Sequence, residues 1–323
     1  MNLRKGLGIA VFIGIIATVG ITGMRGPKKT TVHGVAWYAS FDDALLEAKK
    51  TGKPILLLSM FGKLDEEMPC ANARTLRATL FKDPEFKKLI STDVIPAWEM
   101  VRAVPKIEID LGDGKKIKRT VRGNAVMYLC NSEGRVIDAY PGVYTAADFM
   151  PAIRESMGFA NADTKSIMDF HRENGKMITR TEVTMGKAMV ESPTLNLIGA
   201  KAISGKVSNS GGGSTERKVF LDAARQLTDM SLRPMTSEDV IARVTGKPSE
   251  GRDPAEIAQE IIRNDSKTNM TRVRPVIHLW FVSETELPTP AQAREAVLET
   301  ILKIPYKDPY FGLKDVLLPG TPY

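Results

Sequence analysis

Cysteine and histidine are scarce in this chain of 323 residues. Two cysteines, Cys70 and Cys130, are too few for a disulfide-dense secreted mini-domain or for a zinc site made of four cysteines. The three histidines, His33, His171 and His278, lie far apart in the sequence, so they do not form a predicted metal cluster. We therefore expect no metal site and no cofactor.

Charge of one sign is also weak. The chain has 45 Lys and Arg residues and 38 Asp and Glu residues, a formal net charge of +7. Because basic and acidic residues are interleaved, this excess indicates solubility rather than binding to nucleic acid. Hydrophobic residues make up 43% and charged residues 26%, an ordinary globular balance, and the length predicts about two domains.

One long run without charge stands near the N-terminus, over residues 7–23. It is short for a membrane span and long for the apolar part of a signal peptide. Arg4 and Lys5 precede it, and no clear small-x-small cleavage site follows. Residues 1–26 are therefore expected to be a retained membrane anchor or a cleaved signal peptide, and both alternatives place the rest of the chain outside the cytoplasm.

Helix and strand signals alternate over residues 32–158. A helix is predicted from Ser40, a natural N-cap, to Gly52, and a buried strand follows over residues 55–60. The further predictions are helices over residues 70–80 and 145–157, a short helix that begins at Asp83, strands over 94–101, 125–130 and 135–139, and a hairpin excursion over 111–118 with its turn at Asp113-Gly114. This order predicts a mixed sheet with a parallel crossover, an antiparallel hairpin at its edge and helices on both faces.

The stretch from Trp37 to about Met157 resembles the thioredoxin fold, in particular bacterial thioredoxin-like proteins with a helix before the first central strand. The motifs that carry the resemblance are Trp37-x-x-Ser40-Phe41 with Gly52-Lys53-Pro54, a cysteine at a helix start, Phe81-x-Asp83-Pro84-Glu85-Phe86, and Gly123 followed by Glu133-Gly134-Arg135 and Tyr140-Pro141-Gly142. The resemblance implies an α/β fold, with a thioredoxin-like mixed sheet flanked by helices over residues 32–158. Residues 160–323 resemble no family, and we expect them to form a mostly helical α+β domain.

The active site that the resemblance implies is incomplete. Thioredoxin-like oxidoreductases use C-x-x-C at the helix start, and the spacing aligns Cys70 with the attacking cysteine, so that Ala73 stands where the resolving cysteine would be. The alternative register places Cys70 second and Glu67 first, but it makes the helix three residues too long. The family's cis-proline loop, which grips substrate peptides, corresponds to Gly123, Asn124 and Ala125, and a peptide bond before alanine is expected to be trans.

The reactivity of Cys70 has arguments on both sides. A helix N-terminus and Arg74, one turn further on, would lower the pKa of the thiol and make Arg74 a candidate thiolate stabiliser. Asp65, Glu66 and Glu67 in the preceding loop favour the neutral thiol. Cys130 lies five residues beyond Ala125 on the same predicted strand, about 17 Å away, which is too far for a disulfide with Cys70. We expect Cys130 to be a buried apolar side chain.

The C-terminal region has fewer signals. Helices are predicted over residues 215–230, 236–244, 253–262 and 289–304, a flexible loop over 206–215, and a strand over Pro275–Ser283 that contains His278 as a satisfied core side chain. Residues 199–207 differ from a phosphate loop in spacing and lack its Ser or Thr, so we expect no nucleotide binding. The segment from Pro305 to Tyr323 is expected to be a loop that packs across another part of the chain.

Two functions follow from these observations. The first is a non-catalytic binding or assembly module of the cell envelope, held in the bacterial inner membrane through residues 7–23, with its bulk in the periplasm and an unidentified protein as partner. The second is a monothiol thiol–disulfide oxidoreductase or redox sensor that acts through Cys70. The loss of the second cysteine and of the cis-proline favours the first.

Overall fold

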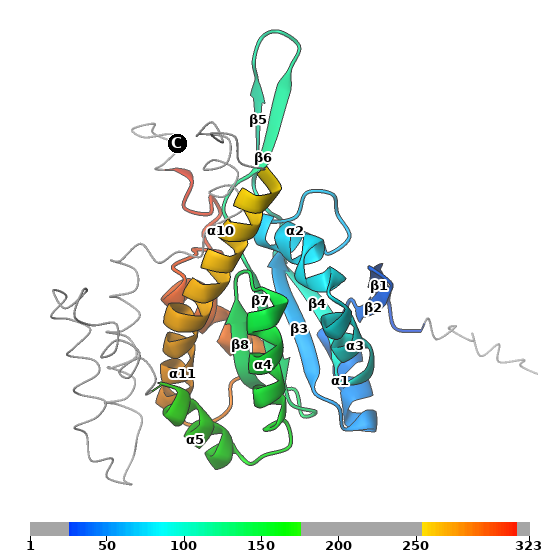
Figure 1. The fold of residues 1–323 in the computed structure, drawn as a ribbon, viewed down its shortest axis with the longest axis vertical. Coiled ribbons are helices and arrows are strands. Elements are labelled where there is room, and N and C mark those ends of the chain that lie inside the picture. Colours follow the sequence, from blue (N-terminus) through cyan, green and yellow to red (C-terminus); the bar gives the residue numbers. More distant parts are fainter. Residues whose placement is uncertain (1–25, 176–253, 315–323) are drawn as a thin grey trace, which may run out of the picture.

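The structure is a computed structural model that describes residues 26–175 and 254–314. Within them the fold is mixed α/β, with one central sheet covered by helices (Figure 1). Several predictions lie outside the described residues: the anchor at 7–23, the phosphate-loop-like stretch at 199–207, the loop at 206–215, the helices at 215–230 and 236–244, and the last residues from 315 on. Among the described helices, none combines the length and the apolar composition needed to cross a membrane.

The central sheet has six strands in the order β1-β2-β4-β3-β7-β8. Its strands are β1 (Lys29–Val32), β2 (Val35–Tyr38), β3 (Ile55–Phe61), β4 (Ile95–Arg102), β7 (Ala125–Cys130) and β8 (Val136–Pro141). β3 runs parallel to β4 and antiparallel to β7, and β7 runs antiparallel to β8. The mixed sheet with a parallel crossover and an antiparallel hairpin is therefore confirmed.

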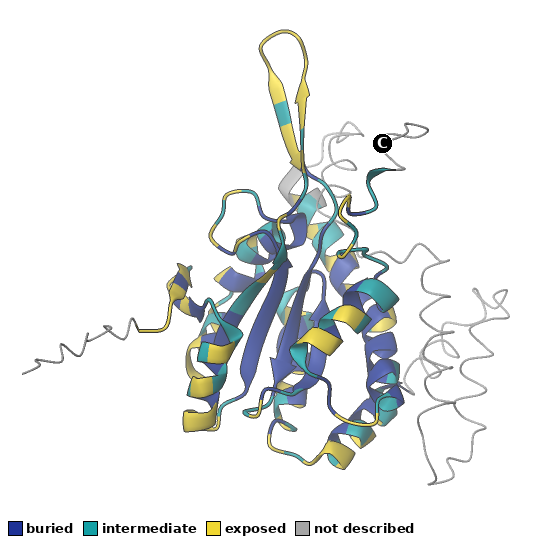
Figure 2. Cartoon of the chain, turned by 180° about the vertical axis from the view of Figure 1, so that it is seen from behind, coloured by how far each residue is buried: buried dark blue, intermediate teal, exposed yellow. Residues whose placement is uncertain are grey.

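The sheet is buried because its central strands are apolar on both faces. Every residue of β3, β7 and β8 is buried, as Figure 2 shows by their dark blue colour. Such strands require helices on both sides, since a solvated face would show alternating polar residues.

The helices between and after these strands include three that begin at the capping residues found in the sequence. They are α1 (Phe41–Thr51), α2 (Ala71–Ala78), the 3₁₀ turn η1 (Leu80–Lys82), α3 (Pro84–Thr92) and α4 (Ala146–Met157). Ser40, Asp83 and Thr145 each accept a hydrogen bond from a backbone N–H of the first turn, which satisfies a donor that has no partner within the helix. Gly52 ends α1 in the left-handed conformation, as its position after the last helical turn predicts.

The C-terminal region contributes helices to the same body. These are α5 (Thr164–Gly175), α10 (Pro254–Thr268), the π-helical turn η2 (Asn269–Val273), α11 (Arg274–Ser283), α12 (Pro290–Arg294) and the π-helical turn η3 (Glu295–Ile301). One hydrophobic cluster joins the sheet to α11 and η3. A capping box at Thr289 starts α12 as predicted, and the last helix ends at Ile301.

The predicted strand over Pro275–Ser283 is wrong. These residues form most of α11, and His278 is therefore a helical residue. An apolar run of this length is compatible with a buried strand and with a buried helix, and periodicity alone cannot separate them. In residues 254–314 the structure contains helices and turns but no strand, so the α+β description does not apply to that part of the chain.

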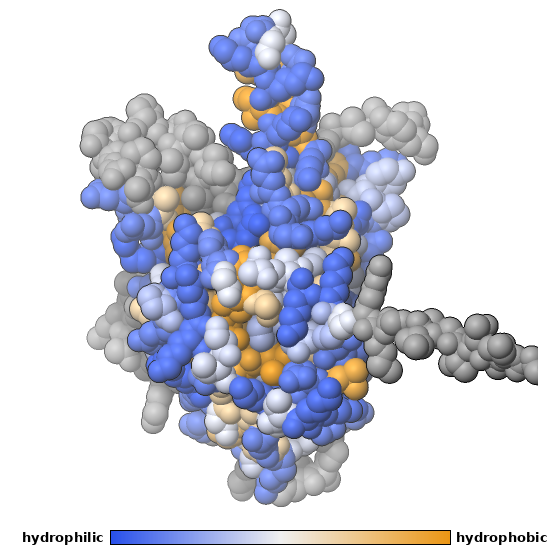
Figure 3. All heavy atoms as spheres, turned by 90° about the vertical axis from the view of Figure 1, so that its right-hand side faces the viewer, coloured by the Kyte–Doolittle hydropathy of each residue, from blue (hydrophilic) through white to orange (hydrophobic). Residues whose placement is uncertain are grey.

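A two-stranded hairpin, β5 (Lys106–Asp110) with β6 (Lys116–Thr120), projects from the body at the top of Figure 1. The predicted turn at Asp113-Gly114 joins its strands, which are longer than the sequence indicated. Ile109 and Leu111 are 49% and 53% exposed, and hydrophobic atoms are visible along the hairpin in Figure 3. The hairpin therefore carries apolar surface that the rest of the described chain leaves exposed to solvent.

Candidate functional site

Cys70 lies beside the end of β3, immediately before α2. Its side chain is fully buried and is not part of a disulfide. The backbone N–H of Cys70 donates to the carbonyl oxygen of Phe61 (2.9 Å), and the thiol donates to the carbonyl oxygen of Asn124 (3.3 Å). These two bonds hold the cysteine between the last residue of β3 and the segment that precedes β7.

The segment Gly123–Ala125 faces Cys70, as the resemblance to the thioredoxin fold predicts. The Asn124 side-chain oxygen accepts hydrogen bonds from the side chain of Asn72 (2.6 Å) and from the backbone N–H of Ala125 (2.7 Å). The described residues contain no cis peptide bond, so the expectation of a trans bond before Ala125 is confirmed. The three candidate residues are thus brought together with Cys70, although without a proline.

Gly123 allows this close approach. Its φ is +93°, and a Cβ atom placed there would lie 3.0 Å from the Cys70 Cβ and 3.2 Å from the Phe61 Cβ. We expect Gly123→Ala to lower the free energy of unfolding by about 1–3 kcal/mol, since it combines backbone strain with crowding of buried atoms. Urea unfolding measures this. Gly112→Ala is the matched control, because Gly112 has a similar φ of +80° and open space around it. An equal loss in both variants would contradict the crowding argument.

Two arginines of α2 lie near the cysteine. Arg74, the predicted thiolate stabiliser, donates to the hydroxyl of Thr120 (3.2 Å). Arg77, which the sequence analysis did not single out, donates to the carbonyl oxygens of Leu64 and Glu66, both at 2.9 Å. Burial lowers the pKa of Arg77, and the Arg74 charge does the same, while Cys70 and the acidic loop raise it. Arg77 therefore holds the acidic loop and is electrostatically coupled to Cys70.

A segment from the C-terminal region covers this end of the sheet. We call residues 303–314 the strap. Arg102 donates to the carbonyl oxygens of Tyr306 (3.0 Å), Asp308 (2.6 Å) and Pro309 (3.2 Å) of the strap. The ring of Phe311, fully buried, packs on Phe61 with centroids 5.1 Å apart. The prediction that the end of the chain packs across another part of the chain is confirmed for these residues.

Cys130 is remote from Cys70. It pairs with Ile55 at the start of β3, whereas Ala125 pairs with Met60 near the end of that strand. The side chain is fully buried, and burial raises the pKa of its thiol. The predictions of a buried apolar role and of no disulfide with Cys70 are confirmed, since neither cysteine is part of a disulfide.

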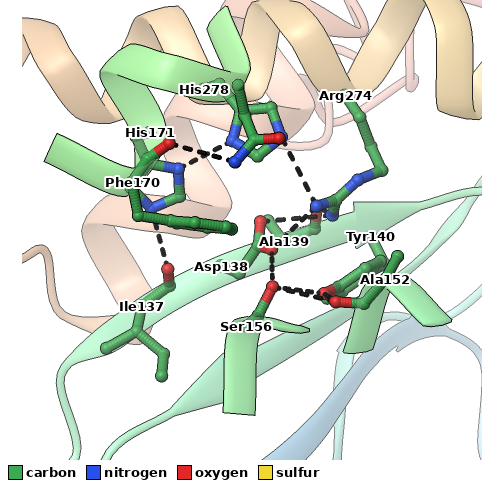
Figure 4. Close-up of polar contacts among 11 residues, drawn as sticks. Ile137, Asp138, Ala139, Tyr140, Ala152, Ser156, Phe170, His171, Arg274 and His278 are labelled. Atoms are coloured by element: carbon green, nitrogen blue, oxygen red, sulfur yellow. Dashed lines mark hydrogen bonds and ion pairs between the residues drawn. The ribbon is translucent and has the colours of Figure 1, made fainter. Parts of the chain in front are cut away.

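A second polar constellation lies under α11 and was not predicted (Figure 4). The Asp138 carboxylate of β8 and the Arg274 guanidinium of α11 form a buried ion pair, with 2.9 Å between Arg274 Nη2 and Asp138 Oδ2. Burial by itself would raise the pKa of the Asp138 carboxyl, but Arg274 holds it well below its usual range. Ser156 donates to Asp138 (2.5 Å) and Tyr140 interacts with Ser156 (2.8 Å), which extends the network into α4.

The two histidines of this constellation have determined tautomers. His171 Nε2 lies 2.9 Å from the carbonyl oxygen of Ile137, so it must carry the proton and donate. His171 Nδ1 then accepts from His278 Nδ1–H (2.8 Å), and His278 Nε2 accepts from Arg274 (3.4 Å). Both rings are therefore neutral. Burial lowers the pKa of His171 to about 4, and burial followed by the Arg274 charge lowers the pKa of His278 well below its usual value.

The observation that the histidines lie far apart in sequence did not exclude this cluster. Ligand atoms of Asp138, His171 and His278 lie within 4.8 Å of one another, which is close enough to hold a cation. The donors do not fit a metal ion, however, because the four histidine nitrogens are hydrogen-bonded and the carboxylate already accepts from Arg274, Ser156 and the N–H of Ala139. A metal would also meet the buried guanidinium charge. The cluster is a structural network that joins α5 and α11 to β8.

A cavity of about 940 Å³ lies between η1, the start of α4 and α10. Lys82, Arg263 and Lys267 give it a basic rim, and the first turn of α4 opens into it. Asp148 occupies that helix terminus, since its carboxylate accepts hydrogen bonds from the hydroxyls of Thr145 (2.8 Å) and Ser266 (2.5 Å). The cavity therefore does not offer an uncompensated helix terminus to an anion.

Comparisons with known proteins identify no relative: no family model, no curated protein and no solved structure matches the chain.

Proposed function

We propose that this protein is a non-catalytic binding or assembly module of the bacterial cell envelope, built on a thioredoxin-like domain whose thiol site is closed. The burial of Cys70 carries the proposal. Attack on a disulfide requires an accessible thiolate, whereas this thiol is 0% exposed and donates to a carbonyl oxygen. Ala73, at the position of the resolving cysteine, is also buried.

The arrangement of the sheet supports a thioredoxin-like domain. Helix α1 precedes β3, the parallel pair β3–β4 is followed by the antiparallel pair β7–β8, and a cysteine begins the helix after β3. Cys70 also faces Gly123–Ala125, the segment that corresponds to the family's substrate-gripping loop. These features were expected from the resemblance.

The envelope location rests on the sequence of the N-terminus. The charge-free run at residues 7–23 follows Arg4 and Lys5, the order typical of an inner-membrane anchor or a signal peptide. In the retained form, this run would tether the protein at the membrane and leave its bulk in the periplasm. Fractionation of cells and the mass of the mature chain distinguish a retained anchor, a cleaved signal and a chain that stays in the cytoplasm.

The monothiol reading has one observation in its favour. Cys70 is the N-cap of α2 and is coupled electrostatically to Arg77, and both features stabilise a thiolate. For this reading to hold, the Cys70 thiol would have to become exposed to solvent during turnover.

Thiol exchange separates the two functions. We expect Cys70 in the folded full chain to form a mixed disulfide with oxidised glutathione at least about 100-fold more slowly than in the urea-unfolded chain, because only rare openings expose the thiol. Mass spectrometry of proteolytic fragments measures the adduct at Cys70. Exchange at the rate of the unfolded chain would contradict a closed site.

Binding is tested in membranes that carry the full chain. After amine crosslinking, a binding module gives the same protein adducts for the native sequence and for Cys70→Ala, with or without reductant. Adducts that disappear in Cys70→Ala or on reduction would indicate monothiol chemistry, and the absence of adducts would contradict a binding module.

A further inference from the structure

The strap is held in place by one fully buried side chain and by arginine hydrogen bonds to its backbone carbonyls. We propose that residues 303–314 are a releasable strap, which opens independently of the rest of the fold and thereby controls access to Cys70. The device goes beyond the proposed function, because it concerns the opening of the site and does not depend on what the protein binds.

The strap has one fully buried anchor, Phe311. Three other apolar residues are only partly buried against the core, namely Ile304, Tyr306 and Leu313, and Lys307, Pro309 and Tyr310 are exposed. Residues 303–313 contain no regular secondary structure, and their internal backbone bonds close short turns, such as the bond from the Phe311 N–H to the Asp308 carbonyl (2.9 Å). A segment with one fully buried side chain and no regular secondary structure opens at a lower free energy than the core does.

Two arginines latch the strap through its backbone. Arg102 holds three carbonyl oxygens, and Arg122 donates to the carbonyl oxygen of Phe311 (3.0 Å). The Arg102 guanidinium also lies over the Phe311 ring, 5.0 Å from its centroid. The carbonyl acceptors of this latch carry no net charge. The strap also forms ion pairs, from Lys307 to Glu295 (2.8 Å) and to Glu299 (3.3 Å), but the Lys307 side chain is 53% exposed, and exposed pairs of this kind contribute little to holding a segment in place.

Backbone strain stands near each end of the strap. Lys303 has a φ of 51° and Phe311 a φ of 56°, both in the left-handed region that non-glycine residues seldom adopt. For a bulky residue such as Phe311 this conformation is a true outlier, and outliers of this kind cluster in switch regions. Opening would relieve the strain at both positions, which favours a two-state segment over a rigid one.

The region under the strap connects it to the thiol. Phe311 packs on Phe61, the carbonyl of Phe61 accepts the Cys70 N–H, and Gly123 approaches both Phe61 and Cys70. When Phe311 leaves, Phe61 loses its cover and the strand ends beside Cys70 become open to solvent. Cys130, the last residue of β7, is fully buried and pairs with Ile55 at the start of β3, away from the end that the strap covers, so opening of the strap leaves it covered.

Because neither cysteine is part of a disulfide, the reactivities of the two thiols can be compared within one chain. The experiment is alkylation of the full native chain with iodoacetamide at pH 8, with each cysteine quantified by mass spectrometry over a series of low urea concentrations. We expect Cys70 to react at least about tenfold faster than Cys130 and with a weaker urea dependence, as for a local opening that exposes little surface. Equal alkylation rates of Cys70 and Cys130 with equal urea dependence would overturn the proposal of a releasable strap.

Substitutions in the strap assign the opening to it. Phe311→Ala is expected to raise the Cys70 rate by a further factor of about ten or more while the Cys130 rate changes much less. Tyr310→Ala is the matched control, since Tyr310 is the neighbouring aromatic residue and is 57% exposed. A Phe311→Ala chain that leaves the Cys70 rate unchanged, or raises both rates equally, would overturn the proposal unless it is globally unfolded. If Phe311→Ala is globally unfolded, the alkylation rates of Cys70 and Cys130 are measured instead in Arg102→Gln, which weakens the latch and keeps Phe311. An unchanged Cys70 rate, or an equal rise of both rates, in this variant would overturn the proposal.

These outcomes are separate from those of the proposed function. Equal reactivity of the two thiols would contradict the releasable strap and leave the proposal of a closed, non-catalytic module intact. Protein adducts that depend on Cys70 would contradict the non-catalytic module, whether or not the strap opens.

Discussion

Arg274→Met is expected to destabilise the folded chain by about 3–5 kcal/mol, the usual cost of leaving one charge of a buried ion pair without its partner. Asp138 is 0% exposed, and the Arg274 guanidinium contributes two of its hydrogen bonds, at 2.9 and 3.2 Å. Methionine keeps much of the volume of the side chain but supplies neither charge nor donors. Urea unfolding at pH 7 measures the loss.

The control is the same substitution at an exposed ion pair. Arg154 lies 3.0 Å from Glu85, and both side chains are more than half exposed. Arg154→Met should therefore cost less than about 1 kcal/mol. If Arg274→Met cost no more than this, the buried pair would not stabilise the fold.

A double variant tests whether the cost comes from the stranded carboxylate. Asp138→Asn removes the charge and keeps the size of the side chain, so Arg274→Met combined with Asp138→Asn is expected to be less destabilised than the sum of the two single variants. The difference from additivity is the coupling energy of the pair. Additive losses would indicate that each residue acts through its own packing alone.

The ion pair also explains how distant parts of the chain form one body. Asp138 belongs to the edge strand β8, and Arg274 begins α11, more than a hundred residues later. Because a buried charge requires a specific partner, the pair fixes the position of α11 on β8 in a way that apolar contacts alone do not. The sheet and the C-terminal helices consequently share one hydrophobic cluster.

The elements around the sheet were predictable because their signals are local. Ser40 and Asp83 cap helices within three residues of their own positions, and the apolar run from Ile55 identifies a strand buried on both faces. The position of Cys70 opposite Gly123–Ala125 followed from the resemblance. These elements can be predicted from local sequence signals, without knowledge of long-range contacts.

The parts that could not be predicted depend on long-range contacts. Nothing in the sequence near Phe311 indicates that it covers Phe61, and the network of Asp138, His171 and Arg274 joins three separate elements. Arg274 and His278 are four residues apart and lie on one face of α11. Residues at this spacing share a face in a strand as well as in a helix, so it could not correct the wrong strand assignment over Pro275–Ser283.

The histidine pair makes stability sensitive to acid. A histidine with a folded-state pKa below its unfolded value of about 6.5 binds its proton more readily when the chain is unfolded. Stability is therefore full above the unfolded pKa and falls as the pH drops towards the folded pKa, by about 1.4 kcal/mol per pH unit and histidine. For His171, with a folded pKa of about 4, the loss between pH 6.5 and pH 4 reaches about 3 kcal/mol, and His278 adds to it in the same direction.

The other titratable groups that face the pair do not share this window. The pKa of Asp138 is lowered, so its contribution is lost between its unfolded pKa of about 3.9 and the lowered folded value, mostly below pH 4, and Arg274 stays charged throughout. Tyr140, which packs beside them, has a raised pKa and remains neutral in acid. The loss of stability between pH 6.5 and pH 4 at this network therefore belongs to the two histidines.

Urea unfolding from pH 7.5 to pH 4 compares His171→Phe with His33→Gln. Phenylalanine preserves the stacking of residue 171 on Phe281, where the ring centroids lie 4.0 Å apart, and removes the proton site, while His33 is exposed. His171→Phe should be less stable at pH 7.5, because it loses the bonds to His278 and Ile137, but it should lose about 3 kcal/mol less than the native chain on acidification. His33→Gln should follow the native curve. Curves that stay parallel for His171→Phe and the native chain would mean that acid acts elsewhere, since carboxylates common to both cancel in the comparison.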